Sequence, residues 1–234
     1  MARGVALSEL ISQVRDELRR ANSPSASPDD TASIRQTINH VYYILGMTND
    51  WPFLNTLFDG ITLQAGSRYY DFPEGLDPDR VIEAKVYWSS FYTDIERGIS
   101  LADYNSYNPN LNERSAPILK WDVKFTGTKE QIEVWPLPDS TSQVLQFYGT
   151  QALPPLVNNT DKCKLESNII VLYAAAELAP KDSADKDAKL ELAKEGLRLI
   201  KLRGNSAAGA TYRLGVGHEP EKKVHPRAIV RIGG

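Results

Sequence analysis

Apolar residues recur at helical spacing in two segments near the start of the chain. Charged side chains fill one face of residues 7–18, and the apolar positions are Leu7, Leu10, Ile11, Val14 and Leu18. The second stripe consists of Ile34, Ile38, Val41, Tyr42 and Leu45. Ser-Pro-Asp-Asp at 27–30 is typical of a helix start, and we expect the second helix to end at Gly46. The pattern predicts two amphipathic helices that pack as a hairpin.

The pattern changes between residues 51 and 157. Short β-branched and aromatic runs alternate there with Gly, Pro, Asn and Asp, which is typical of antiparallel strands joined by turns. The candidate strands are residues 57–63, 69–72, 81–88, 121–125, 131–135 and 144–150. Residues 100–105 are expected to form a short helix or turn, because the Ser100 hydroxyl can cap it.

Two further helices are expected later in the chain. The first is residues 165–178, which should end before Pro180, because the residue before a proline disfavours helical torsions. The second is residues 182–203, with Gly204 as its stop. We therefore expect an α+β fold: an antiparallel bundle of four main helices with an inserted antiparallel β-domain and an extended C-terminal arm. The expected boundaries are 1–50 with 160–204 for the bundle, 51–159 for the β-domain and 205–234 for the arm.

The last thirty residues differ from the rest of the chain. Residues 205–234 contain five basic residues against two acidic ones, together with several glycines and prolines. Such a segment has too few apolar residues to offset the entropy of ordering itself. Its end, residues 228–232, is strand-like and suited to adding to the edge of a sheet in another chain.

Charge and hydropathy exclude several classes of protein. The net charge of -3 gives the chain no overall basic field, which argues against bulk DNA binding. The longest apolar run, residues 169–176, is far shorter than a membrane span. Charged residues also interrupt any candidate signal peptide. We therefore expect a soluble protein made in the cytoplasm, with no membrane partner.

Few residues carry a signal for chemistry. Cys163 has no histidine near it in sequence, and we interpret it as a small residue at a helix edge rather than a nucleophile. His40, His218 and His225 lack metal-ligand spacing, although the last two could share a metal with an acidic neighbour. The chain has no glycine-rich phosphate loop flanked by a strand and a helix, and no Gly-x-Ser-x-Gly motif. We expect no cofactor, no metal and no catalytic residue.

Two other sets of residues leave alternatives open. Glycoside cleavage needs two carboxylates across a groove, and the candidates are Glu74, Asp77, Asp79 and Glu83. Their setting has the composition of a surface turn, which favours solvated acids. Aromatic residues could form a sugar or base platform, although core packing or a subunit interface is favoured. They are Trp51, Phe53, Trp88, Phe91, Tyr92, Trp121, Trp135, Phe147 and Tyr148.

Four landmarks, the last of them in two parts, occur in a characteristic order along the chain. They are NDWPF at 49–53, YDFP at 70–73, QIEVWPLPD at 131–139, LPPL at 153–156 and IIVLYAAAE at 169–177. In this order, residues 7–203 resemble the head-to-tail adaptor proteins of podovirus-like tailed phages, a family of head-completion or connector subunits.

The resemblance implies a non-enzymatic virion protein at the head–tail interface. It implies a dodecameric ring of this chain beneath the portal protein, a tail nozzle or tube protein as a further partner, and DNA that passes through without specific binding. It also implies that the C-terminal arm reaches onto the portal. The arm residues expected to bind the portal are Tyr212, Arg213, Lys222, Lys223, Arg227, Ile229, Val230, Arg231 and Ile232.

Two alternative functions remain at this point. One is a virion-associated peptidoglycan hydrolase that uses the acids of residues 74–83. The other is a carbohydrate- or receptor-binding tail accessory protein built on the β-domain.

Overall fold

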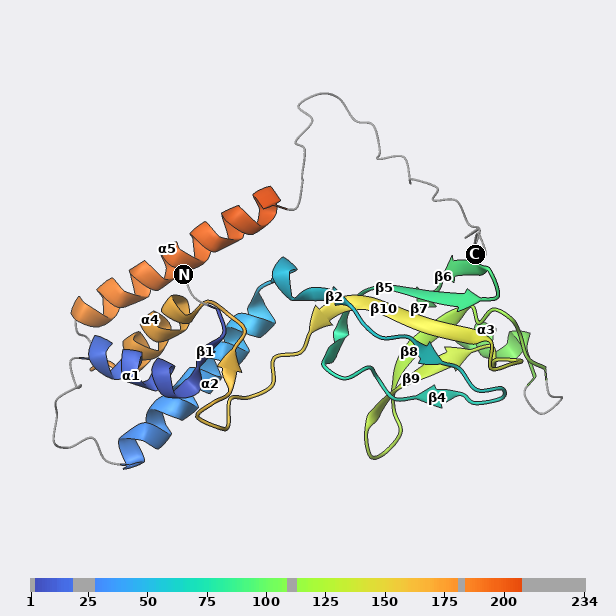
Figure 1. Cartoon of the computed structure of the whole chain (residues 1–234), viewed down its shortest axis with the longest axis horizontal. Coiled ribbons are helices and arrows are strands. Elements are labelled where there is room, and N and C mark those ends of the chain that lie inside the picture. The colour runs from blue at the N-terminus through green and yellow to red at the C-terminus, as the bar shows by residue number, and fades with distance from the viewer. Residues whose placement is uncertain (1–2, 19–27, 109–112, 181–183, 208–234) are drawn as a thin grey trace, which may run out of the picture. The chain divides into compact units, whose positions relative to one another are not determined.

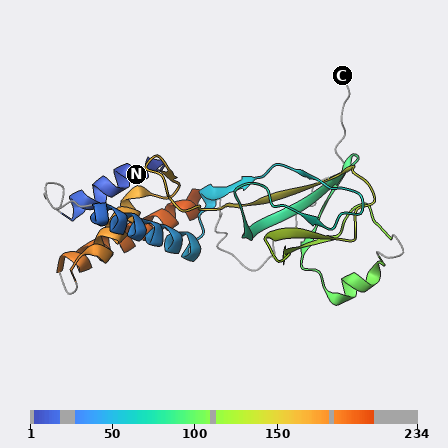
Figure 2. The same ribbon diagram turned by 90° about the horizontal axis from the view of Figure 1, so that it is seen from below.

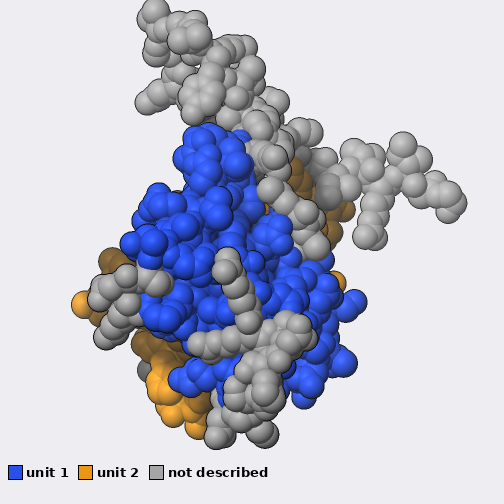
Figure 3. Space-filling view, turned by 90° about the vertical axis from the view of Figure 1, so that its left-hand side faces the viewer, with its two compact units in different colours: residues 1–52, 153–212 blue, residues 53–152, 213–234 orange. Residues whose placement is uncertain are grey.

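The computed structural model describes residues 3–18, 28–108, 113–180 and 184–207. They divide into two compact units, which Figure 3 colours blue and orange. Unit 1 contains the helices on either side of the segment Phe53–Ala152, and unit 2 is built from that segment (Figure 1). Each unit has its own core.

Unit 1 is organised around one mostly apolar and largely buried helix. Its helices are α1 (Leu7–Glu17), α2 (Pro28–Thr48), α4 (Ser167–Leu178) and α5 (Ala184–Ala207). Helix α4 contacts the other three. Its residues Ala174, Ala175 and Ala176 are buried, and small side chains let neighbouring helices approach closely. Lys189 joins α5 to α1, because its Nζ lies 2.8 Å from Asp185 Oδ2 and 3.6 Å from Glu17 Oε1.

A small sheet lies within unit 1. Strand β1 (Val5–Ala6) pairs antiparallel with β11 (Lys162–Cys163). The Gly4 nitrogen donates to the Cys163 carbonyl at 2.7 Å. Gly4 has a φ of +77°, a conformation that a residue with a side chain adopts only rarely. This sheet fixes the start of α1 beside the segment that leads into α4.

Helix α2 does not end at Gly46, so that expectation is wrong. A Cβ at Gly46 would lie 2.6 Å from Leu153 Cδ1, so the glycine allows Leu153 to pack against the helix. The helix continues to Thr48, after which Asn49 Nδ2 and Trp51 Nε1 both donate to the Leu45 carbonyl, at 3.0 and 3.1 Å. Side chains therefore satisfy a carbonyl near the helix end. A short 3-10 helix, η1 (Pro52–Leu54), follows.

The first sheet of unit 2, which we name sheet B, is antiparallel. Its strands are β2 (Asn55–Leu57), β3 (Ile61–Thr62), β5 (Leu76–Trp88), β6 (Phe91–Asp94) and β10 (Gln143–Gln151). The order is β2–β10–β5–β6, and β3 also pairs with β10. The register shifts on either side of Gly149, where a Cβ would lie 3.0 Å from the Arg80 carbonyl oxygen. A side chain here would be in an unusually tight contact with the β5 backbone, so the glycine favours this close approach of two strands.

The second sheet, sheet C, has the order β4–β9–β8–β7. Its strands are β4 (Tyr69–Tyr70), β7 (Glu96–Arg97), β8 (Lys120–Phe125) and β9 (Glu130–Trp135). Strands β7 and β8 are parallel, and helix α3 (Leu101–Ser106) lies between them in the chain. Figure 2 shows α3 as the green helix outside the two sheets.

Both sheets contribute to one hydrophobic core. Trp121 of sheet C packs edge-on against Phe147 of sheet B, with ring centroids 4.9 Å apart. The core residues are Phe58, Leu63, Tyr70, Leu76, Ala84, Val86, Ile95, Ile118, Trp121, Ile132, Val134, Leu145 and Phe147. Alternate residues of β5, β9 and β10 therefore face the space between the sheets.

The expected fold class, a four-helix antiparallel bundle with an inserted antiparallel β-domain, is wrong. The described residues contain eleven strands in three sheets, against five α-helices. One sheet lies among the helices of unit 1, and sheet C contains a parallel pair. The strands that overturn the expected fold class have only two residues each, which is too few to show a periodic pattern in the sequence. Helix α5 also passes Gly204 and ends at Ala207.

Candidate assembly surfaces

The candidate acids form surface charge pairs. Asp77, Asp79 and Glu83 each lie within 4.0 Å of a basic side chain, and Glu74 is exposed in the turn before β5. Among the described residues, no group of His, Cys, Asp and Glu could hold a metal ion. This arrangement suits solvated acids better than a catalytic pair.

Cys163 is a buried structural residue. It lies in β11 rather than at a helix edge, and its Sγ is 3.5 Å from the Leu165 carbonyl oxygen. Burial raises the pKa of this thiol to about 11, so it stays protonated at neutral pH. A thiol in this state is a poor nucleophile.

The aromatic candidates divide between the interior and the surface. Trp51, Trp121, Trp135 and Phe147 are buried, as core packing predicts. Phe53, Phe91 and Tyr148 are exposed on unit 2. Core packing does not account for these three exposed aromatic side chains, which indicates that they belong to a contact surface.

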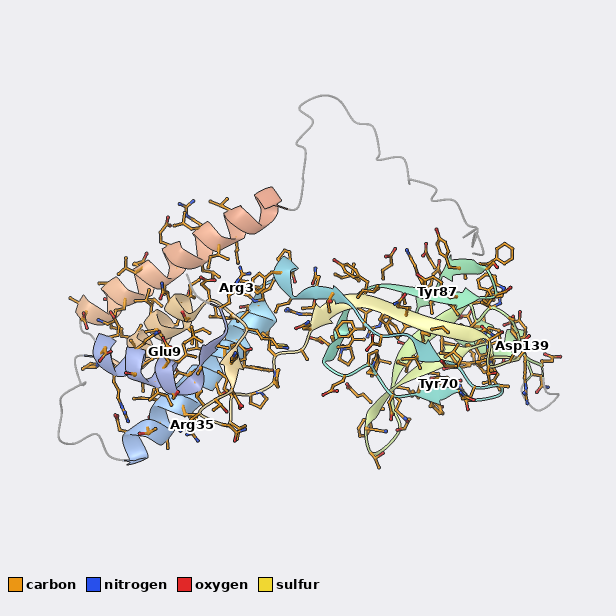
Figure 4. The ribbon with its side chains drawn as sticks, viewed as in Figure 1. Arg3, Glu9, Arg35, Tyr70, Tyr87 and Asp139 are labelled. Atoms are coloured by element: carbon orange, nitrogen blue, oxygen red, sulfur yellow. The ribbon has the colours of Figure 1, made fainter. Side chains whose placement is uncertain are left out.

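One candidate surface is the side of sheet B turned away from sheet C, here named the outer face. On β10 it presents Val144, Gln146 and Tyr148, whose partners across the ladder are Tyr87, Lys85 and Glu83 of β5. Their chain neighbours face the core, because successive side chains of a strand point to opposite sides. Figure 4 labels Tyr87 on this side of the sheet.

The outer face combines apolar groups with a small charge cluster. Leu57 pairs with Tyr148 across β2 and β10, and its side chain is 62% exposed. Lys85 Nζ lies 3.3 Å from Glu83 Oε1 and 3.7 Å from Asp94 Oδ1. One lysine thus pairs with two carboxylates, so the cluster carries a net negative charge.

The outer face is hollowed in two adjoining places. One hollow of about 330 Å³ is lined by Leu57, Glu83, Lys85, Tyr87, Gln146 and Tyr148. The other, of about 540 Å³, shares Tyr87 and Gln146 with it. Aromatic, aliphatic and paired charged groups in one shallow surface are typical of protein–protein contacts.

A second candidate surface is a groove on unit 1, here named the helix groove. It has a volume of about 400 Å³, and most of its lining is apolar. The lining residues are Val41, Ile44, Leu45, Thr48, Asn49, Tyr173, Ala176, Glu177, Lys186, Leu190 and Leu197. Helices α2, α4 and α5 all contribute, so the groove suits an apolar side chain or a helix.

One polar cluster in unit 2 has no signal in the sequence. Arg68 Nε donates to Glu133 Oε1 at 2.7 Å, and the Tyr104 hydroxyl donates to the same oxygen at 2.8 Å. The Arg68 guanidinium also lies over the Tyr104 and Trp135 rings, at 4.9 and 5.2 Å from their centroids. Glu133 is 1% exposed. The cluster fixes α3 against sheet C, and we assign it a structural role.

Comparison with known protein families shows which family carries these surfaces. The model of the family described as SU10 adaptor protein matches residues 5–214. The chain belongs to this family. It is a family of phage head-to-tail adaptors, which confirms the resemblance found in the sequence. A search of curated proteins found no match.

Membership of the adaptor family places the protein in the virion as a structural component. Adaptors interact with other virion components such as the portal and the tail. Within the described part of the adaptor, no helix is both long and apolar enough to cross a bilayer.

The portal-binding residues expected in the C-terminal arm belong to a different part of the chain. Tyr212, Arg213, Lys222, Lys223, Arg227, Ile229, Val230, Arg231 and Ile232 all lie outside the described residues. Tyr212 and Arg213 fall within the stretch that matches the adaptor family, and the others follow it.

Proposed function

We propose that this adaptor forms a ring between the portal and the tail of a phage particle, and that the ring leaves a conduit for DNA. The observation that carries the proposal is the match to the adaptor family over residues 5–214. The exposed, partly apolar surfaces on both units support it, because a ring subunit needs faces with which to contact neighbours and partners.

The ring is proposed to contain twelve copies, as the family resemblance implies. Contacts that are weak singly become strong in a closed ring, since each engaged copy raises the effective concentration of the next. The chain is made in the bacterial host, and it acts mechanically rather than as an enzyme.

The C-terminal arm is proposed as the portal-binding element. Its excess of basic residues and its strand-like end, residues 228–232, suit a segment that orders on a partner. The tail nozzle or tube protein is the proposed partner on the other side of the ring.

The test is a pull-down of purified portal protein by the full chain and by a chain that ends at Ala207, where α5 ends. Truncation should abolish portal capture, and the double substitution Lys222→Ala/Lys223→Ala should weaken it. Lys124→Ala/Lys129→Ala removes the same charge from two exposed positions of unit 2 and is the matched control, which should bind as the full chain does. Undiminished capture by the truncated chain would refute the arm's role. Electron microscopy of the captured complex tests the ring itself.

A further inference from the structure

Helix α5 has a second apolar face besides the one that packs on α4. Ile200 points inward and is buried, whereas Leu192, Leu199 and Leu202 are 61%, 37% and 54% exposed. The three leucines lie seven and three residues apart, so they share one side of the helix, with Glu195 between them. We name this side the leucine face. In Figure 1, α5 is the orange helix of unit 1.

The helix groove lies on the other flank of α5. Leu190 and Leu197 line the groove. With about 3.6 residues per turn, they point roughly 160° away from Leu192 and Leu199. One copy therefore carries a groove on one flank of α5 and an apolar ridge on the other. A contact between two different faces repeats from copy to copy and closes into a ring when the rotation allows it.

We propose that the leucine face of one copy docks in the helix groove of the next copy, and that this contact repeats around the ring. The proposal rests on the ring proposed above, and it names the surfaces that build that ring. The mode of contact is a helix laid in an apolar groove.

The apolar parts of the two surfaces fit each other. The groove presents Val41, Ile44 and Leu45 from α2 opposite Leu190 and Leu197 from α5. Its volume of about 400 Å³ leaves room for leucine side chains, since a cavity of about 150 Å³ can hold a benzene molecule. Docking would remove the leucine face from water, which an isolated copy cannot do.

The charges of the two surfaces also complement each other. Glu195 and Arg198 pair at 2.7 Å on the leucine-face side of α5. The groove is lined by one basic residue, Lys186, and one acidic residue, Glu177. Glu195 of one copy can therefore face Lys186 of the next, and Arg198 can face Glu177. A carboxylate on each surface disfavours DNA as the occupant, because phosphates are also negative.

The first test removes the leucine face. Leu192→Ser/Leu199→Ser should weaken self-association of the full chain by about tenfold or more, measured by mass photometry of the chain alone and on isolated portal. Leu119→Ser removes a leucine of unit 2 that is 49% exposed, and this control should assemble as the unchanged chain does. Circular dichroism checks that each variant is folded.

The second test uses the difference between the two faces. Ile44→Arg places a charge in the groove and should also prevent rings. A mixture of Ile44→Arg copies and Leu192→Ser/Leu199→Ser copies retains one competent contact, so it should form pairs and nothing larger. Full rings in the mixture, or no pairs, would contradict the docking.

Disulfide trapping tests the contact even where assembly is weak. Ile44→Cys/Leu199→Cys in one chain should give an oxidised ladder larger than a dimer, whereas either single variant should give dimers at most. Cys163 should not interfere, because it is buried.

If the unchanged chain forms no ring, alone or on portal, the proposed ring itself is wrong. If it forms rings and Leu192→Ser/Leu199→Ser copies form them equally well, only the docking mode is wrong.

Discussion

At the scale of single residues, the most consequential contact is the pair of Arg68 and Glu133. Glu133 is almost fully buried, and its carboxylate accepts from both Arg68 and Tyr104. Removing one partner of a buried pair leaves an uncompensated charge, which is more costly than losing an exposed pair.

We therefore predict that Arg68→Ala lowers the free energy of unfolding by about 2 kcal/mol, less than for a fully buried pair because Arg68 is partly exposed. Urea unfolding followed by circular dichroism measures it. Lys129→Ala breaks the exposed pair with Asp71 in the same unit and should have a clearly smaller effect. Equal effects of the two substitutions would show that the buried cluster contributes nothing special.

The sequence predicted some residue roles and could not predict others. Trp121 and Phe147 are core residues, as expected from their strands. Tyr148 follows Phe147, and alternation requires that one of the two faces outward, but it does not say which side of the sheet is covered. Arg68 and Glu133 meet only because β4 and β9 pair, and no local spacing signals that pairing.

At the scale of elements, α3 shows how a very short helix is held in place. A six-residue helix is not stable alone. The Ser100 hydroxyl accepts from the Asp103 nitrogen at 3.2 Å, and the Asp103 carboxylate accepts from the Ser100 nitrogen at 2.7 Å. Lys120 Nζ and Trp135 Nε1 add bonds to the Asp103 carboxylate and carbonyl, at 2.9 and 2.6 Å. Asp103 thus ties the helix cap to sheet C.

These contacts predict a pH dependence. Hydrogen bonds from Ser100, and then from Lys120, lower the pKa of Asp103 to about 2 from an ordinary 3.8. The stabilisation is fully present above pH 3.8 and is lost as the pH falls through 2, because the unfolded chain takes up the proton first. Asp103→Asn should therefore flatten the loss of stability in this window.

The measurement is the midpoint of urea unfolding at several pH values between about 5 and 2. Ser100→Ala removes the largest cause of the shift and should flatten the profile in part. Identical pH profiles for the unchanged chain and Asp103→Asn would contradict the role assigned to Asp103.

Long elements were predictable and very short ones were not. Helix α2 and strands β5, β8, β9 and β10 overlap segments with a clear period, and α4 overlaps the longest apolar run of the chain. Strands β1, β3, β4 and β11 have two residues each, so their pairing depends on tertiary contacts alone. The end of α2 was misplaced because Gly46 serves close packing with Leu153, which a sequence reading cannot distinguish from a helix stop.

At the scale of the whole molecule, the charge balance bears on the proposed conduit. The chain carries 27 basic and 30 acidic residues, and its basic excess is confined to the C-terminal arm. A conduit that let DNA slide would need few phosphate contacts, since each one adds to salt-dependent affinity.

We predict that the full chain does not retain duplex DNA in a filter-binding assay at about 0.15 M salt and about 10 μM protein. A chain that ends at Ala207 lacks the basic arm and should behave in the same way. Retention by the full chain that is lost on truncation would show that the arm binds DNA, and it would count against portal binding as the arm's sole role.

The paired strands β2 and β10 have a consequence for how such proteins diversify. Asn55 and Thr150 are partners in this ladder, and their side chains hydrogen-bond at 2.9 Å. The two points at which the chain enters and leaves unit 2 are therefore close neighbours. A module with adjacent ends can be exchanged, enlarged or replaced by a short turn without rebuilding the helices around it. Recombination between phages could thus swap this module as a cassette while the helical part is inherited unchanged.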